Sequence, residues 1–236
     1  YFQIVKCFRD EDLRADRQPE FTQLDMEMSF VGEEDVQRVI SDVMARAVEA
    51  VRGESPSLPF PRMTWGEAMR RFGSDKPDTR FGVELADVSD FVKDSDFGVF
   101  AGCVAGGGRV RMLAAPVSRG QIKRLEKLGK EYGAKGLAWA KVVAEGDGLV
   151  LADGVAKFLG PQAAALIEAT GAKDGDVLLA VADSFKTSAA ALGAVRLEIG
   201  KTLGLVDESR LDFVWIIEFP MFDQDEETGA LSPAHH

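Results

Sequence analysis

Cysteine and histidine are scarce in this sequence, with two residues of each kind among 236. Cys7 and Cys103 lie far apart in apolar surroundings, which excludes a disulfide framework and a cysteine-based metal centre. We expect both to be buried thiols in a reducing compartment. His235 and His236 are adjacent, but no third or fourth ligand stands nearby at a spacing that suits a metal. We therefore expect no metal site within these residues.

Long apolar runs are also missing. No stretch approaches the roughly 20 consecutive apolar residues that cross a bilayer, so no membrane partner is expected. The first residues already follow a strand pattern, without the basic and apolar prelude of a signal peptide. Hydrophobic residues make up 46% and charged residues 28% of the chain, which is typical of globular proteins. This length allows one large domain or two smaller ones.

Basic residues are fewer than acidic residues. Lysine and arginine total 28 against 39 aspartates and glutamates, and the net charge is −11. Proteins that bind nucleic acids usually carry a basic face, so charge alone argues against a nucleic-acid partner. Net charge does not, however, describe any single local face.

The most informative stretch is residues 1–30, which read as a strand, a charged loop and a second strand. The first strand is predicted for residues 1–8, and the loop for residues 9–20, where acidic and basic residues alternate. The second strand alternates strictly, and period two puts alternate residues on opposite faces. One face carries Phe21, Gln23, Asp25 and Glu27. The other carries Thr22, Leu24, Met26, Met28 and Phe30, and we expect it to pack on a core.

The side chains on the polar face of this strand are suited to ligand binding. Carboxylates two residues apart on a strand, such as Asp25 and Glu27, project side by side, about 7 Å apart. If enclosed, they favour a bound cation, such as a substrate ammonium group or a metal. The alternative is the solvated face of an ordinary antiparallel strand. Arg9, at the end of the first strand, can hold a phosphate with two hydrogen bonds, and Phe21 offers a flat ring for a nucleobase.

The residues after this strand show helical periodicity. Apolar residues at helical spacing predict an amphipathic helix over residues 33–51, ended by Gly53. A short helix is predicted to Phe72, with Thr64 and Glu67 in a capping box. Residues 73–81 form a polar, turn-rich segment that by itself reads as a solvated linker, and Asp75, Lys76 and Arg80 within it are given no role.

From about residue 85 strands and helices alternate over about 120 residues, which is enough for a separate α+β module with its own core. Strands are predicted at 109–115, 135–143 and 177–182, with turn signals and a second short strand within 146–152. One helix is predicted to start at Ser118, where Ser118 and Gln121 form a capping box. Another is predicted to start at Pro161, and a third to span residues 187–203. The glycines at 106–108 lack the lysine and spacing of a phosphate loop, so a surface turn is expected there. The apolar run 211–219 predicts a buried strand that returns to the first part of the chain.

Two stretches carry a family resemblance. Cys7-Phe8-Arg9-Asp10-Glu11 through Asp25-Met26-Glu27 resembles the second signature motif of class II aminoacyl-tRNA synthetases, in particular the bacterial aspartyl-tRNA synthetase type. Residues 73–81 match a segment that precedes the inserted domain of that family. The resemblance spans the chain but covers only the middle part of the family's proteins.

The resemblance implies an α+β fold, in which a partial class II antiparallel-sheet catalytic core carries an inserted α+β domain. Residues 1–84 would be the N-terminal part of the core, residues 85–209 the insertion (a GAD-like domain), and residues 210–236 the return to the core. It also implies an aspartate–tRNA ligase, which activates L-aspartate with ATP to aspartyl-adenylate and transfers it to the 3′ end of tRNA. A cytoplasmic location and a homodimer are expected of the complete protein.

The motif implies a role for each matched position. The positions expected to bind ATP are Arg9, Asp10, Glu11, Gln18 and Phe21, with Arg9 as the catalytic group at the α-phosphate. Those expected to bind aspartate are Gln23, Asp25, His235 and His236. Those expected to meet the tRNA acceptor end are Asp12, Leu13, Arg14, Asp16 and Arg17.

Several parts of the family are absent from these residues, including its first and third motifs and the acidic ligands of Mg²⁺. We therefore expect this stretch to be inactive alone. In the complete protein ATP is the expected substrate, and the Mg²⁺ ligands are expected outside this stretch. A non-catalytic tRNA-binding paralogue that keeps only the motif is the alternative. An amidotransferase-type protein that shares only the insertion would not carry the run from Arg9 to Glu11.

Overall fold

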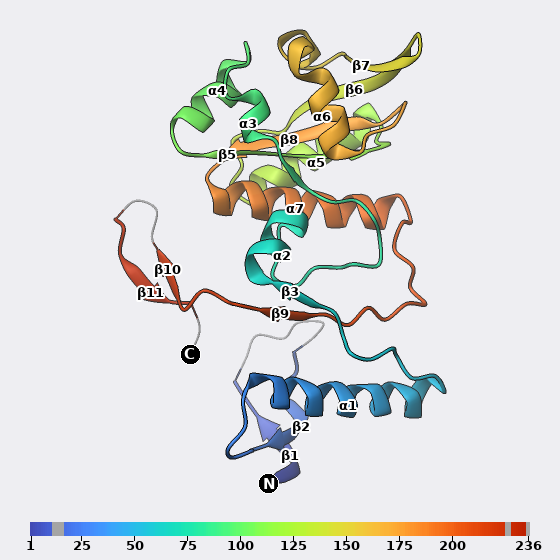
Figure 1. The fold of residues 1–236 in the computed structure, drawn as a ribbon, viewed down its shortest axis with the longest axis vertical. Helices are drawn as coiled ribbons and strands as arrows, with labels where there is room; N and C mark the ends of the chain where they lie inside the picture. Colours follow the sequence, from blue (N-terminus) through green and yellow to red (C-terminus); the bar gives the residue numbers. More distant parts are fainter. Residues whose placement is uncertain (11–16, 225–227, 235–236) are drawn as a thin grey trace. The chain divides into compact units, whose positions relative to one another are not determined.

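The computed structural model describes residues 1–10, 17–224 and 228–234. Contacts divide the chain into two compact units, residues 1–60 and 61–236 (Figure 1). Helices and mostly antiparallel strands make it an α+β protein, as the sequence predicts. None of the helices in the described residues combines the length and the apolar character that a membrane span requires.

The first unit begins with a β-hairpin. β1 (Phe2–Phe8) pairs antiparallel with β2 (Glu20–Met26), and Phe2 lies opposite Met26. Both predicted strands are confirmed, although the second ends at Met26 instead of continuing to Phe30. Phe30 has a φ of 59°, a left-handed conformation that cannot continue a strand.

The predicted amphipathic helix is confirmed as α1 (Glu33–Arg52). Asp35 caps its start by accepting a hydrogen bond at Oδ2 from the Gly32 N–H, at 3.1 Å. The acidic first turn suits the positive end of the helix dipole. Gly53 ends the helix with a φ of 80°, which glycine adopts without a steric penalty.

The expectation that the apolar face of β2 packs on a core is wrong for this chain. Leu24 is 41% exposed, and its neighbour across the pair, Ile4, is 74% exposed. Alternation decides which side chains share a face, but burial requires a second layer over that face. A two-stranded hairpin by itself supplies none.

The second unit is built on a five-stranded sheet in the order β4-β5-β8-β6-β7, in which every neighbouring pair is antiparallel. Its strands are β4 (Ala86–Asp87), β5 (Arg109–Ala115), β6 (Ala138–Glu145), β7 (Gly148–Ala152) and β8 (Val177–Asp183). The predicted strands are confirmed, except that β6 begins three residues later than expected, at Ala138. Residues 135–137 instead form an irregular link from the preceding helix.

Helices cover both faces of this sheet (Figure 1). α5 (Arg119–Glu131) and α7 (Phe185–Thr202) pack on one face, against Leu179 and Val181 of β8. α3 (Ser89–Val92), α4 (Gly98–Ala105) and α6 (Ala163–Thr170) pack on the other, against Leu178 and Ala180. Both faces of β8 are therefore buried, which explains why this central strand is a continuous apolar run.

The remaining elements of this unit are short. They are β3 (Arg62–Thr64), α2 (Trp65–Phe72), the 3-10 helices η1 (Ala156–Phe158) and η2 (Gly160–Gln162), β9 (Trp215–Ile217), β10 (Phe222–Gln224) and β11 (Leu231–Pro233). Two predicted caps are confirmed. Thr64 Oγ1 accepts from the Glu67 N–H at 3.1 Å, and Ser118 and Gln121 form a capping box at the start of α5.

The strand predicted for residues 211–219 is much shorter and less buried than expected. Only Trp215–Ile217 forms a strand, β9, and it pairs in parallel with β3. Leu211 is 44% and Phe219 41% exposed. Apolar composition alone therefore overestimated burial, because in the described residues β3 and β9 make a sheet of only two strands.

Within the second unit, Arg196 ties residues 78–83 to α7. It is 1% exposed and donates hydrogen bonds to the carbonyl oxygens of Asp78 at 2.8 Å, Phe81 at 3.0 Å, and Val83. Its guanidinium lies over the rings of Phe72, 4.8 Å from the centroid, and Phe81, 3.9 Å. The turn-rich segment after α2 is thus held in place by a buried cation, and is not a solvated linker.

Candidate active site

The β1–β2 hairpin places most of the described candidate residues on one face. Directly opposite residues of an antiparallel pair share a face. The register sets Gln3 opposite Asp25, Val5 opposite Gln23 and Cys7 opposite Phe21. The Arg9 N–H donates to the Pro19 carbonyl at 2.9 Å, so the pairing extends into the loop and Arg9 continues the same face.

The Asp25 carboxylate is half-buried and is held by a neighbouring strand. Gln3 Nε2 donates to Asp25 Oδ2 at 3.2 Å, and the Tyr1 hydroxyl donates to Gln3 Oε1 at 3.2 Å. Sequence reasoning did not single out Gln3. The antiparallel register between the two strands is the signal that would have found it, because it places Gln3 directly across from Asp25.

Gln23 is oriented in a similar way. The Cys7 thiol donates to Gln23 Oε1 at 3.4 Å. Cys7 is a free cysteine, as predicted, but it is half-buried and not fully buried, because the hairpin leaves this face open. Its thiol therefore contributes a weak hydrogen bond to the polar face.

Arg9 and Phe21 lie together at the end of the hairpin nearest the loop. The guanidinium carbon of Arg9 is 5.4 Å from the centroid of the Phe21 ring, within the range of a cation–π contact. Arg9 is exposed and Phe21 half-buried. An exposed guanidinium beside an aromatic ring offers a phosphate contact and a stacking surface within a few ångströms of each other.

The other candidate positions divide into two groups. Asp10, Arg17 and Gln18 are exposed on the loop between the strands. The second group is Glu11, Asp12, Leu13, Arg14, Asp16, His235 and His236, and these lie outside the described residues. The structure therefore brings together Arg9, Phe21, Gln23 and Asp25 from the predicted set, with Gln3 added.

A metal site is not apparent in the parts of the chain that the structure describes. No group of three or more histidine, cysteine, aspartate or glutamate side chains is arranged there to hold an ion. Within the paired strands this face offers the Asp25 carboxylate, two amides and the Arg9 guanidinium, and Glu27 follows directly after β2. Such a set suits the binding of an organic substrate with both an ammonium and a phosphate group.

Comparison with known proteins places the chain in a family. A model of tRNA synthetases class II (D, K and N) matches residues 1–236. The chain belongs to this family of class II tRNA synthetases, which confirms the predicted resemblance.

Individual proteins of known name are also similar to this chain. The chain is 51% identical over 242 residues to an aspartate–tRNA ligase of Bacillus licheniformis, which it matches along its whole length while covering 40% of the relative. It is 52% identical to an aspartate–tRNA ligase of Geobacillus kaustophilus and 50% identical to an aspartate–tRNA(Asp/Asn) ligase of Bacillus subtilis, with the same coverage. The chain thus spans about two-fifths of the length of these relatives.

Proposed function

We propose that this chain is part of an aspartate–tRNA ligase, which activates L-aspartate with ATP and transfers the aspartyl group to the 3′ end of a tRNA. The observation that carries the proposal is that Arg9, Phe21, Gln23 and Asp25 share one face of the hairpin. The relatives named aspartate–tRNA ligase, at about 50% identity over the whole chain, support the choice of reaction.

In this proposal ATP lies along the Arg9 end of the polar face. The adenine ring stacks on Phe21, and Arg9 contacts the α-phosphate, where charge grows as the aspartate carboxylate attacks. A fixed guanidinium at that position stabilises the transition state more than the ground state. Asp10, Glu11 and Gln18 of the loop complete the ATP contacts, and the ligands of the Mg²⁺ that accompanies ATP are expected outside these 236 residues.

Aspartate lies further along the same face. The carboxylate of Asp25 pairs with the substrate ammonium group, with Gln23 beside it, and His235 and His236 complete the aspartate site. The hydrogen bond from Gln3 holds Asp25 in place before substrate arrives, and such preorganisation lowers the cost of binding.

The loop residues Asp12, Leu13, Arg14, Asp16 and Arg17 meet the acceptor end of the tRNA in this proposal. The domain boundaries at residues 84–85 and 209–210 belong to the same proposal, as does a homodimer of the complete protein. The parallel pairing of β3 with β9 supports the return of residues 210–236 to the first part of the chain.

The test is ATP–pyrophosphate exchange by the complete protein and its Arg9→Ala variant. Loss of a charge-stabilising group at the reacting phosphorus should lower aspartate-dependent exchange by about a hundredfold or more. Arg38→Ala is the matched control, because Arg38 is an exposed arginine on α1 that pairs with Asp35, and it should exchange at the wild-type rate. Wild-type exchange by Arg9→Ala would refute the phosphate role.

The same assay distinguishes a ligase from the alternative, a non-catalytic tRNA-binding paralogue. A complete protein that binds tRNA but shows no aspartate-dependent exchange would be a non-catalytic paralogue. The 236 residues alone should give no exchange, because the family's other motifs lie outside them, and activity of this stretch by itself would contradict that expectation.

A further inference from the structure

An ion pair between Lys186 and Asp223 joins two segments of the second unit that are far apart in the sequence. Lys186 lies in the first turn of α7, and Asp223 lies in β10. The Lys186 ammonium nitrogen is 3.1 Å from Asp223 Oδ1. The pair therefore connects the proposed insertion, which contains α7, to the segment that returns from it.

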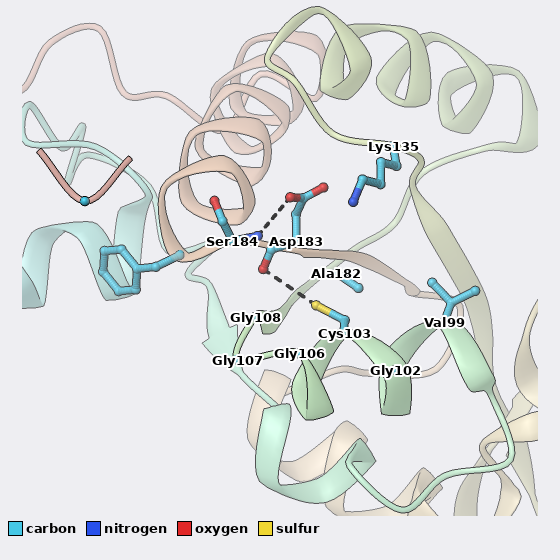
Figure 2. A pocket seen from close by; sticks show the side chains of 12 residues that line it. Val99, Gly102, Cys103, Gly106, Gly107, Gly108, Lys135, Ala182, Asp183 and Ser184 are labelled. Atoms are coloured by element: carbon cyan, nitrogen blue, oxygen red, sulfur yellow. Dashed lines mark hydrogen bonds between the residues drawn. The ribbon is translucent and has the colours of Figure 1, made fainter. Parts of the chain in front are cut away.

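The backbone at the start of α7 is held by several hydrogen bonds. Asp183 Oδ1 accepts from the Ser184 N–H at 2.9 Å, and Ser184 Oγ accepts from the Thr187 N–H at 3.2 Å. The Cys103 thiol of α4 donates to the Asp183 carbonyl oxygen at 3.7 Å (Figure 2). Cys103 is half-buried and not fully buried as expected. These contacts fix the backbone from which Lys186 projects.

The residue before Lys186 is anchored by a buried cation. The guanidinium carbon of Arg111 lies 4.4 Å from the centroid of the Phe185 ring, and the Trp65 ring centroid is 6.4 Å from it. Arg111 is fully buried and donates a hydrogen bond to the Met69 carbonyl oxygen of α2. The first turn of α7 is thus part of the rigid body of the second unit, and Lys186 extends from a fixed support.

The hairpin of β10 and β11 has less support of its own. Its two strands pair with each other, and in the described residues neither pairs with a third strand. Phe222 of β10 is 52% exposed and Leu231 of β11 is 67% exposed. A two-stranded hairpin by itself is at best marginally stable in water. Its position therefore depends on its contacts with neighbouring elements.

A hollow of about 880 Å³ lies between this hairpin and α4. Its lining includes Val99 and Gly102 of α4, Ser184 and Phe185 at the start of α7, and Gly229 between the two strands of the hairpin. In the part of the chain that the structure describes, no side chains fill this space, so packing against α4 does not fix the hairpin. The ion pair at the start of α7 is the contact that holds it.

The hairpin leads directly to two of the predicted aspartate contacts. The Ala234 N–H donates to the Met221 carbonyl oxygen at 3.1 Å, so the antiparallel pairing continues one residue beyond β11. His235 and His236, which are expected to bind aspartate, follow Ala234 in the sequence. A displacement of the hairpin therefore displaces Ala234 and the start of the chain that carries the two histidines.

We propose that Lys186 is a positioning residue for the aspartate site. Its ion pair with Asp223 fixes the β10–β11 hairpin, and the hairpin fixes the chain that enters His235. This inference rests on the proposed function, and it gives the insertion a part in the activation of aspartate. The two side chains are 49% and 53% exposed, and an exposed pair adds little to overall stability. Its loss should therefore shift the hairpin without unfolding the protein.

The test is ATP–pyrophosphate exchange by the complete protein with the two charges reversed. Lys186→Glu and Asp223→Lys each bring like charges together, so each should raise KM for aspartate by about two- to fivefold and leave KM for ATP unchanged. The double variant restores the pair with its charges swapped and should return KM for aspartate to within about twofold of the wild type. Lys123→Glu, the same change at an exposed position of α5, is the control and should alter neither KM. A wild-type KM for aspartate in Lys186→Glu, or a double variant as impaired as the single ones, would overturn the proposal.

A second measurement does not depend on enzymatic activity. Amide hydrogen–deuterium exchange at residues 219–224 and 231–234 should be faster in Lys186→Glu than in the wild type, and should slow again in the double variant. Unchanged deuterium uptake there would show that the ion pair does not hold the hairpin, whether or not the protein is a ligase. A complete wild-type protein without aspartate-dependent pyrophosphate exchange would instead refute the proposed function, and with it the role of Lys186 in positioning the aspartate site.

Discussion

Gly73 and Gly193 lie backbone against backbone where the end of α2 meets the middle of α7. A Cβ atom on Gly73 would lie 2.9 Å from the Gly193 Cα, and one on Gly193 would lie 2.7 Å from the Gly73 carbonyl oxygen. Gly73 also has a φ of 67°, which ends α2. The two helices belong to segments far apart in the sequence, and they meet because neither has a side chain at the contact.

Gly193→Ala should therefore destabilise the protein by about 1–3 kcal/mol, the usual cost of overpacking a tight contact. Urea unfolding followed by circular dichroism measures the change. Gly120→Ala in α5 is the matched control, because a Cβ there meets no heavy atom within 4 Å. It should be neutral or stabilise the protein by up to about 1 kcal/mol. A Gly193→Ala protein as stable as the wild type would show that the helices separate at little cost.

Arg196→Met should be strongly destabilising. It removes the donors to three carbonyl oxygens in residues 78–83, and each buried acceptor left without a partner costs about 1–3 kcal/mol. Burial lowers the pKa of Arg196 to about 10, so the side chain remains charged at neutral pH. Arg196→Lys should restore little, because an ammonium group lacks the planar fork of donors.

Arg124→Met is the control for this prediction. Arg124 pairs with Glu198 on the surface and its side chain is 65% exposed, so its loss should cost about 0–1 kcal/mol. The free energies of unfolding of Arg196→Met, Arg196→Lys and Arg124→Met show whether the buried cation stabilises residues 78–83. Equal losses for Arg196→Met and Arg124→Met would show that residues 78–83 do not depend on the buried cation.

Acid should weaken the second unit through two carboxylates. The hydrogen bond from Arg71 lowers the pKa of Glu84, and the hydrogen bond from Arg80 lowers the pKa of Asp78. Groups with a lowered pKa in the folded state stabilise it above their unfolded pKa values, about 4 for carboxyl groups, and that stability disappears as pH falls through the lowered values. Stability should thus fall as pH drops below about 4.

Glu84→Gln should remove part of this acid sensitivity, because it removes one of the two titrating groups. The free energy of unfolding, measured between about pH 6 and pH 3, should change less steeply for Glu84→Gln than for the wild type. Glu145→Gln, at the exposed end of β6, serves as the comparison and should keep the wild-type slope. An unchanged slope in Glu84→Gln would assign the acid sensitivity to other groups.

Gln3→Leu tests whether the neighbouring strand positions Asp25. Without the hydrogen bond from Gln3, the Asp25 carboxylate should be less well oriented, so KM for aspartate should rise by about tenfold or less while KM for ATP stays constant. Lys6→Met is the control, because Lys6 lies on the opposite face of β1 and pairs with Glu20. A parallel change of both KM values in Gln3→Leu would indicate a general loss of hairpin structure instead.

The sequence by itself determined the local elements and the chemistry of the motif. Alternation predicted β2, helical periodicity and Gly53 predicted α1, and Ser118 with Gln121 predicted the start of α5, because these signals depend only on neighbours in the chain. The same alternation placed Phe21, Gln23 and Asp25 on one face. The resemblance of residues 7–27 to a synthetase motif likewise required no structure.

Only the tertiary structure decided pairing and burial. The register brought Gln3 to Asp25, the parallel pairing of β3 with β9 reduced a predicted nine-residue strand to three residues, and Arg196 turned an apparent linker into a fixed segment. Leu24 reads as a core residue but is exposed. Each of these outcomes depends on what packs against a residue from far along the chain, and local pattern carries no information about that partner.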